Sequence, residues 1–465
     1  MKIKLRTLSG PLNINSDDYL TAGLEVYSWL SEHRIDGNNG VYYETNPGSI
    51  IDYSDHPVHG KYGLYSGSAG IGIYLLRLYE VTGDEKYLNE VKSILDELIA
   101  NVEGADFYTE KLKSAPESIL KVTGWHTGIY AGPSGAGVLA LEAYKKIRDE
   151  RYLELARRLA DDILSVSVSR DGGLTLTEDL DIFSDGGFAL YFISLYKAGG
   201  EQKYLDAARD YAAFIYSRRL KGENGGEYYL ANELKNVGMP EGSIYPGFAH
   251  GTAGIGYLYA VLHEADKKEW ELEAAKEVAL FLDLIADEVG DGKLVPYIYG
   301  GVDSDYYIGK YYIGFCHGPA GTSLLYRKLF DITGENKYKE SVIKLVEGII
   351  AAGAPEYFSW GLWNSNCACC GIPGLIEFFT DLYEAYGNER YLEYAKRAAA
   401  KAIADSSEIG AGRAFCGHWD RTDPYNVQTY TGLYSGAAGS ASNLLRLYAH
   451  LNNKTVTPLW EYSYL

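Results

Sequence analysis

The sequence predicts an all-α protein folded as an α/α toroid, a closed ring of seven helical hairpins. Three repeated features predict this fold: a Gly-x-x-Gly turn, an amphipathic segment before the turn and an apolar segment after it. The turns follow one another at roughly 52 to 67 residues between Gly67 and Gly436, and no Pro-rich or Ser-rich linker interrupts them. Repeats sustained in this way stack into one array rather than separate cores. We therefore expect a single domain over residues 1–465.

The segment before each turn has the pattern of a helix on the outside of the ring. In most repeats a charged turn leads into an aromatic residue and then into apolar residues three and four apart, as in GDEKYLNEVKSILDELI. Charged residues fill the positions between them, which describes a helix with one solvated face. The seven segments begin at Asp18, Gly83, Arg148, Gly200, Lys267, Gly334 and Gly387.

The segment after each turn is apolar almost all round, as in IGIYLLRLY after Gly70 and FALYFISLY after Gly187. A helix without a polar face must be surrounded by protein. Each hairpin therefore consists of an outer helix that leads to a buried inner helix. Because the chain alternates between the two rings, all seven turns should lie at one end of the toroid, which we name the mouth.

The turns differ in the residues that surround their glycines. The seven copies are YSGSAG (Tyr65–Gly70), YAGPSG (Tyr130–Gly135), FSDGG (Phe183–Gly187), FAHGTAG (Phe248–Gly254), FCHGPAG (Phe315–Gly321), CCGIPG (Cys369–Gly374) and YSGAAG (Tyr434–Gly439). Glycine permits a positive φ and a close approach of backbones, a structural role that suffices for most copies. Only the fourth, fifth and sixth carry His or Cys directly before the first glycine. The inner-helix N-termini should also favour anions and thiolates at the mouth.

Three cysteines fall in register at the mouth: Cys316 in the fifth turn, and Cys369 with Cys370 in the sixth. Three thiolates around a divalent ion, with one position left open, are typical of a catalytic zinc site, because structural zinc sites are usually closed by four protein ligands. The sequence therefore predicts Zn²⁺ as a cofactor.

Two other ligand sets stay open at this point. Cys367-x-x-Cys370 has the spacing of a structural zinc site or a redox pair, so a closed site could include Cys367 or Cys416. Alternatively, Cys316 and His317 could form a Cys-His ligand pair. His317 could also orient the substrate or simply pack.

Composition excludes several classes of partner. The net charge of -20 disfavours nucleic acid and anionic membrane surfaces, which rely on clustered Lys and Arg. The N-terminal residues lack the apolar run of a signal peptide, and no stretch is apolar for long enough to form a transmembrane segment. Five cysteines, three of them within CACC, do not resemble a secreted disulfide framework. We therefore expect a cytoplasmic protein.

The turns AHGTAG, CHGPAG and CCGIPG resemble those of the lanthionine synthetase C (LanC) family, the cyclases of lanthipeptide biosynthesis, and of their LanC-like relatives. The resemblance covers essentially the whole chain. It implies zinc bound by Cys316, Cys369 and Cys370, where Cys370 replaces the histidine of most members and gives the CCG variant of the pattern. It also implies addition of a thiol, from a peptide cysteine or glutathione, to dehydroalanine or dehydrobutyrine to form a thioether.

The same resemblance implies two catalytic residues. His250 of the fourth turn matches the family histidine proposed to protonate or stabilise the enolate, and Asp181 resembles the aspartate suggested as base for the incoming thiol. Asp179 and Asp185 are close enough in sequence to be confused with Asp181. The expected partners are a dehydrated precursor peptide, or another dehydroamino-acid substrate and thiol, and a separate dehydratase.

Other functions compete with this interpretation. A LanC-like scaffold could bind zinc and a thiol such as glutathione without catalysis. An α/α-toroid glycosidase would suit the acidic composition and the 43 tyrosines, but it gives the three cysteines no role. A zinc-dependent prenyltransferase would need a partner subunit and a different ligand set.

Overall fold

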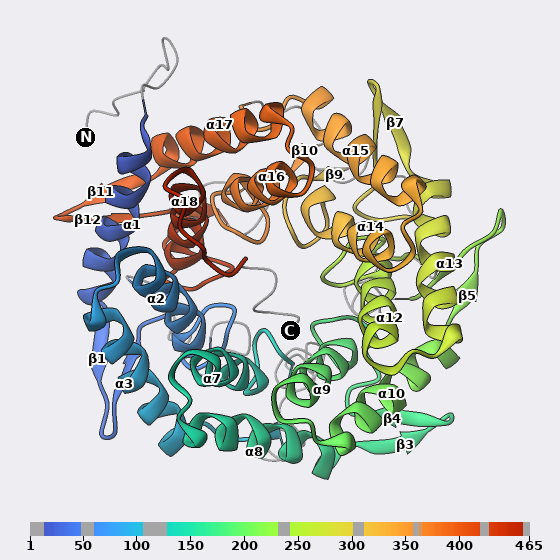
Figure 1. Ribbon diagram of the computed structural model, residues 1–465, viewed down its shortest axis with the longest axis horizontal. Helices are drawn as coiled ribbons and strands as arrows, with labels where there is room; N and C mark the ends of the chain where they lie inside the picture. Colours follow the sequence, from blue (N-terminus) through green and yellow to red (C-terminus); the bar gives the residue numbers. More distant parts are fainter. Residues whose placement is uncertain are drawn as a thin grey trace.

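The predicted α/α toroid is confirmed by a computed structural model that describes residues 14–47, 60–105, 128–230, 242–300, 311–356, 362–363, 365–418 and 427–458. In Figure 1 an inner ring of helices is enclosed by an outer ring, and the chain passes round both once from N- to C-terminus. The expectation of one domain over 1–465 includes residues beyond the described ones and stays a prediction.

The two rings follow the helical periods of the sequence. The outer helices are α1 (Ser16–Ser31), α3 (Glu85–Asn101), α8 (Glu150–Val166), α10 (Gln202–Ser217), α13 (Glu269–Ile285), α15 (Asn336–Ala351) and α17 (Glu389–Asp405). The inner helices are α2 (Ser68–Thr82), α7 (Ser134–Ile147), α9 (Asp185–Gly199), α12 (Thr252–Asp266), α14 (Pro319–Thr333), α16 (Ile372–Tyr386) and α18 (Ala437–Leu451). None of the described helices is both long and apolar enough to cross a bilayer.

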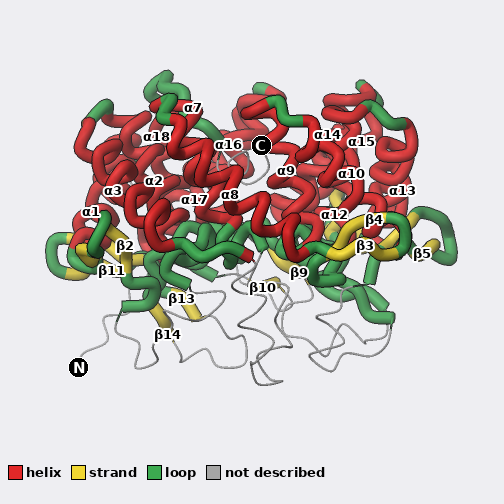
Figure 2. The backbone as a smooth tube through the Cα atoms, turned by 90° about the horizontal axis from the view of Figure 1, so that it is seen from below, coloured by secondary structure: helices red, strands yellow, loops and turns green. Residues whose placement is uncertain are grey.

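Each inner helix except the last passes into the next outer helix through a tight turn. The first residue after the inner helix is left-handed, as at Gly83 (φ 72°) and Gly387 (φ 65°), and the next residue caps the outer helix. Asp84 and Asn388 both accept a hydrogen bond from the second residue of their helix. The longer connections run from outer to inner helix at the other end, where Figure 2 shows most loops and the strands. This end is the mouth.

Short strands, which the sequence did not predict, lie in these longer connections. They are β1 (Arg34–Asp36), β2 (Val41–Tyr43), β3 (Val168–Arg170), β4 (Gly173–Thr175), β5 (Leu220–Lys221), β6 (Glu227–Tyr228), β7 (Asp287–Val289), β8 (Gly292–Leu294), β9 (Tyr311–Tyr312), β10 (Leu362–Trp363), β11 (Ser407–Ile409), β12 (Gly412–Ala414), β13 (Gly417–His418) and β14 (Val427–Gln428). Strands of two or three residues are too short to carry a period-two signal.

Five of the strand pairs are antiparallel hairpins that follow outer helices: β1–β2, β3–β4, β5–β6, β7–β8 and β11–β12. The second strand of each hairpin packs on the next outer helix, so that a Cβ on Gly173 would lie 2.3 Å from the Asp210 carbonyl oxygen. The last hairpin packs on α1, where Gly412 faces Trp29. The hairpins therefore fasten neighbouring repeats together and help to close the ring.

The Gly-x-x-Gly turns are linked by backbone hydrogen bonds around the mouth. Each bond joins the residue two before the first glycine to its equivalent in the next turn. The donor and acceptor pairs are Tyr65 to Tyr130, Ala249 to Cys316, Cys316 to Cys369, Cys369 to Tyr434 and Tyr434 to Tyr65, at 2.7 to 3.2 Å. The third turn takes part in none of these five bonds, which we name the mouth ring.

The glycines serve close backbone approach, as expected, but the expected positive φ is wrong. Gly371, the residue before α16, has φ -142°, which any residue can adopt. A Cβ there would lie 1.7 Å from the Ser365 carbonyl oxygen, and a Cβ on Gly439 would lie 1.5 Å from that of Leu433. Space for a neighbouring carbonyl, rather than backbone conformation, therefore requires glycine at the mouth.

Replacing Gly439 by Ala is expected to destabilise the protein by about 2 kcal/mol or more, because the added methyl group overlaps a backbone oxygen that cannot move alone. Gly417→Ala is the control, since the nearest atom among the described residues, the Asn366 nitrogen, would lie 3.8 Å from its Cβ. Thermal unfolding of both variants checks the claim. Equal midpoints for the two variants would contradict it.

Candidate active site

The candidate site lies on the fifth and sixth turns at the mouth. Cys316 lies three residues before α14, and Cys369 and Cys370 directly precede the glycine that caps α16. The Phe315 and Cys316 N–H groups both donate to the Cys369 carbonyl, at 2.8 and 3.2 Å. The backbones that carry the cysteines are therefore held together by the mouth ring itself.

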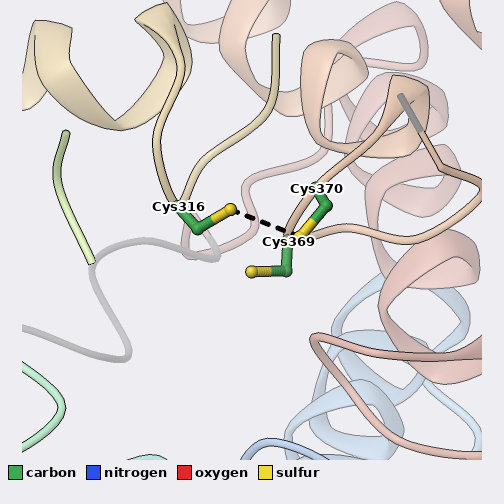
Figure 3. A group of neighbouring side chains, drawn as sticks. All are labelled: Cys316, Cys369 and Cys370. Atoms are coloured by element: carbon green, nitrogen blue, oxygen red, sulfur yellow. Dashed lines mark hydrogen bonds between the residues drawn. The ribbon is translucent and has the colours of Figure 1, made fainter. Parts of the chain in front are cut away.

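The three cysteine sulfurs converge. Those of Cys316, Cys369 and Cys370 lie within 4.8 Å of one another, and those of Cys316 and Cys370 are 3.3 Å apart. Figure 3 shows the side chains of the two turns meeting at this point. A tetrahedral zinc ion with Zn–S bonds of about 2.3 Å separates its sulfur ligands by roughly 3.8 Å. The donor set therefore fits zinc and leaves one coordination position to another molecule.

The three thiols are not equivalent electrostatically. Burial, together with a hydrogen bond to Cys369, raises the pKa of Cys316, and a hydrogen bond with Cys316 is the main cause that raises the pKa of Cys370. Burial also acts to raise the pKa of Cys369. Hydrogen bonds with Cys316, Cys370 and Tyr65 outweigh it, however, and hold that pKa well below its usual value. Without a metal, Cys369 is therefore the thiol that most readily loses its proton. A bound divalent cation would also favour the thiolate forms of Cys316 and Cys370.

The alternative ligands lie to the side of the three sulfurs. Cys367 hydrogen-bonds Cys370 and its sulfur is 3.1 Å from the Ser365 hydroxyl, whereas the Cys416 sulfur is 3.3 Å from the Thr429 hydroxyl. Within the described part of the chain, neither belongs to the group of side chains that could share one ion. The geometry therefore favours the open three-sulfur set over a site closed by either cysteine.

His250 and Asp181 form a pair, although they come from different repeats. The His250 Nδ1 lies 3.2 Å from Asp181 Oδ2, and their side chains are only 12% and 9% exposed. Asp185, in contrast, bonds residues around β4, so Asp181 is the carboxylate that meets the histidine. With the proton on Nδ1 donated to Asp181, Nε2 is the ring nitrogen of His250 that can exchange a proton with a substrate.

His317 lies beside this pair rather than among the sulfurs. Its ring stacks on that of His250 with centroids 5.5 Å apart. It also contacts Tyr245 and Tyr297 at 4.8 Å and Tyr312 at 5.2 Å. His317 therefore supports the His250 ring and, within the described residues, belongs to no group that could share a metal ion. His126, the histidine before the second turn, lies outside the described residues.

One residue of the site was missed from the sequence. Tyr65 was assigned to a structural turn, yet it hydrogen-bonds Cys369. A usable signal existed, because Tyr65 occupies the same turn position as Cys316 and Cys369, two residues before the first glycine. Asp185 was considered from the sequence only as a residue that could be confused with Asp181, because no sequence motif indicates its contacts.

Changing Cys316, Cys369 or Cys370 to Ala should lower bound zinc from about one ion per chain toward none, because two thiolates hold the ion weakly. Cys416→Ala is the matched control and should keep its zinc. Cys370→His should also keep it, since imidazole is a zinc ligand. Metal analysis after competition with a chelator measures the effect, and unchanged zinc in Cys370→Ala would rule out the ligand set.

Known proteins share this chain's sequence pattern and fold. Residues 58–460 match the family described as lanthionine synthetase C-like protein. Nisin biosynthesis protein NisC of Lactococcus lactis subsp. lactis is 27% identical over 336 residues, which cover 63% of this chain and 65% of that protein, just under two thirds of its length. The structure of nisin cyclase aligns with a TM-score of 0.56 and 16% identity over 94% of this chain and 100% of the other. The chain therefore belongs to the lanthionine synthetase C-like family.

Proposed function

We propose that this protein is a zinc-dependent lanthionine synthetase that joins a thiol to dehydroalanine or dehydrobutyrine in a peptide, forming a thioether. The observation that carries the proposal is the meeting of the Cys316, Cys369 and Cys370 sulfurs within 4.8 Å at the mouth. Membership of the LanC-like family and the name of the relative nisin cyclase support the same reaction class. The substrate would be a peptide dehydrated by a separate dehydratase.

The three cysteines would hold the metal. When bound, zinc supplies Lewis acidity that lowers the pKa of the substrate thiol, so that it is a thiolate near neutral pH. Cys316 and Cys369 are anchored through the mouth ring, so they would keep their positions when substrate enters. A preorganised ligand set avoids rearrangement during the reaction.

The His250–Asp181 pair would carry out the proton transfers of the reaction. The substrate sulfur bonds to the β-carbon, the electrons of the carbon–carbon double bond move towards the neighbouring carbonyl, and the resulting enolate needs one proton at Cα. His250 would deliver it from Nε2 while Asp181 holds Nδ1 and stabilises the protonated imidazole. The proton lost by the thiol balances the proton gained by Cα. Asp181 would thus orient and stabilise His250, and it would act on the incoming thiol only through this histidine.

We also propose a cytoplasmic location, because five unpaired thiols suit a reducing compartment. The glycosidase alternative gives no role to the three cysteine sulfurs that meet at the mouth. The alternative of a protein that binds zinc and a thiol without catalysis predicts binding but no thioether product.

The direct test is incubation of the zinc-loaded protein with a peptide that contains dehydroalanine and a cysteine, or with the dehydroalanine peptide and glutathione. Ring closure leaves the mass unchanged but makes the product resistant to thiol alkylation, whereas glutathione addition raises the mass. The proposal expects one of these products. Zinc and thiol binding with neither product would identify a binding protein instead.

His250→Ala should keep its zinc while thioether formation falls roughly 10²- to 10⁴-fold, because the general acid is lost. His263→Ala is the matched control: this histidine lies in the last turn of α12, the helix that begins two residues after His250, it is partly exposed, and its Nδ1 lies 2.8 Å from the Lys268 carbonyl oxygen. Alkylation-coupled mass spectrometry gives the rates. Full activity in His250→Ala would overturn the assigned role.

A further inference from the structure

The third turn takes part in none of the five mouth-ring bonds, and its contacts centre on Asp185. In five turns the N–H two residues before the first glycine donates to the neighbouring turn. In the third turn the N–H of Phe183, the aromatic residue that opens this turn as Tyr65 opens the first, donates to Asp181 Oδ1 at 2.9 Å. One oxygen of Asp181 is therefore held by its own turn, while the other faces His250.

Asp185 ties this turn to the strand that precedes it. Its carboxylate accepts hydrogen bonds from the Thr175 hydroxyl, the Leu176 N–H at 3.2 Å, and the Thr177 N–H and hydroxyl at 3.1 and 3.0 Å. Its own N–H donates to the Asp179 carbonyl at 3.1 Å. Asp185 is fully buried, and burial raises its pKa to about 6. At neutral pH it is therefore ionised, as its four donors require.

These contacts enclose the loop of residues 176–184 that carries Asp181. The end of β4 is fixed to the Asp185 side chain, and the start of α9 is fixed to Asp181, whose carbonyl accepts from the Ser184 and Gly186 N–H groups at 3.1 and 2.9 Å. The carboxylate also sits in the first turn of α9, where the helix dipole stabilises negative charge. The Asp185 side chain therefore joins the start of this loop to its end.

We propose that Asp185 is a positioning residue that holds Asp181 against His250 and so keeps the imidazole of His250 oriented for proton delivery. Its predicted effect on catalysis rests on the proposed function, whereas its effect on the His250–Asp181 pair does not. Asp185 is the first residue of α9, the position that Ser68 has in α2 and Thr252 has in α12, and those two hydroxyls each accept one backbone N–H from the preceding connection, whereas Asp185 accepts four bonds.

The test compares Asp185→Ala, Asp185→Asn and Asp181→Asn in the zinc-loaded protein. Ala removes all the acceptors, whereas Asn keeps one oxygen for the N–H donors and can donate its amide to the Thr175 hydroxyl. Glu271→Ala is the matched control, because Glu271 is likewise a fully buried carboxylate in the first turn of a helix but lies on outer helix α13.

The first readout needs no substrate. Nitrogen-15 NMR of labelled histidines reports the tautomer and pKa of His250, assigned by its loss in His250→Ala. Asp185→Ala should move the His250 signal towards that of Asp181→Asn, with Asp185→Asn staying near wild type. If Asp185→Ala leaves the His250 signal unchanged, the inference is wrong, whatever the protein catalyses.

The second readout is thioether formation. Asp185→Ala should lower kcat by roughly 10- to 100-fold with little change in KM, because substrate binding is kept while the acid is misplaced. In an Asp181→Asn background the same change should have little further effect, since Asp185 acts through Asp181. Full additivity of the two changes would overturn the inference. No product from wild type would instead refute the proposed function alone.

Metal content and thermal unfolding of each variant distinguish a general loss of stability from a specific effect on His250. Glu271→Ala also removes a fully buried carboxylate, so it should lower the unfolding temperature as Asp185→Ala does while it keeps both kcat and the His250 signal. If Asp185→Ala fails to fold, Thr175→Val and Thr177→Val each remove one hydroxyl donor. Each should shift the His250 signal in the same direction by less, and no shift in either variant would contradict the inference.

Discussion

The mouth ring is the interaction on which the rest of the structure depends. Each of its hydrogen bonds joins equivalent positions in neighbouring turns. The backbone N–H and C=O groups of Cys316 and Cys369 therefore hold adjacent repeats together. Buried N–H and C=O groups must be paired, and here the partner is the next repeat. The ring also brings the turns so close that glycine is the only residue that fits at positions such as Gly371 and Gly439. Side chains beside the glycines are then free to differ between repeats.

Chemistry is placed in this frame by substitution at two adjacent turn positions. One position holds Cys316 and Cys369, and the next holds His250, His317 and Cys370, so repeats four to six bring a metal-binding group and an imidazole to one side of the mouth. In the third repeat the Phe183 N–H donates to Asp181 Oδ1 and so helps to orient this carboxylate. The regular repeats thus make the mouth rigid, and the third repeat supplies Asp181, the partner of His250.

The helices and the cysteine cluster could be predicted because both follow from local patterns. Apolar residues three and four apart separate outer from inner helices, and alternation between the rings places every turn at one end. The five β-hairpins were missed, although glycines such as Gly173, Gly292 and Gly412 recur where a strand meets the next outer helix. The Asp181–His250 contact joins two repeats and depends on how the third turn orients the Asp181 side chain, which no spacing in the sequence indicates.

The most direct test of the three-thiolate site is X-ray absorption at the zinc edge of the purified protein without substrate. The assignment to Cys316, Cys369 and Cys370 predicts three sulfur neighbours at about 2.3 Å and one lighter oxygen or nitrogen neighbour, with an unchanged spectrum in Cys367→Ala. Four sulfur neighbours in the wild type that fall to three in Cys367→Ala would contradict it, because the site would then be closed and would have no position for a substrate thiol.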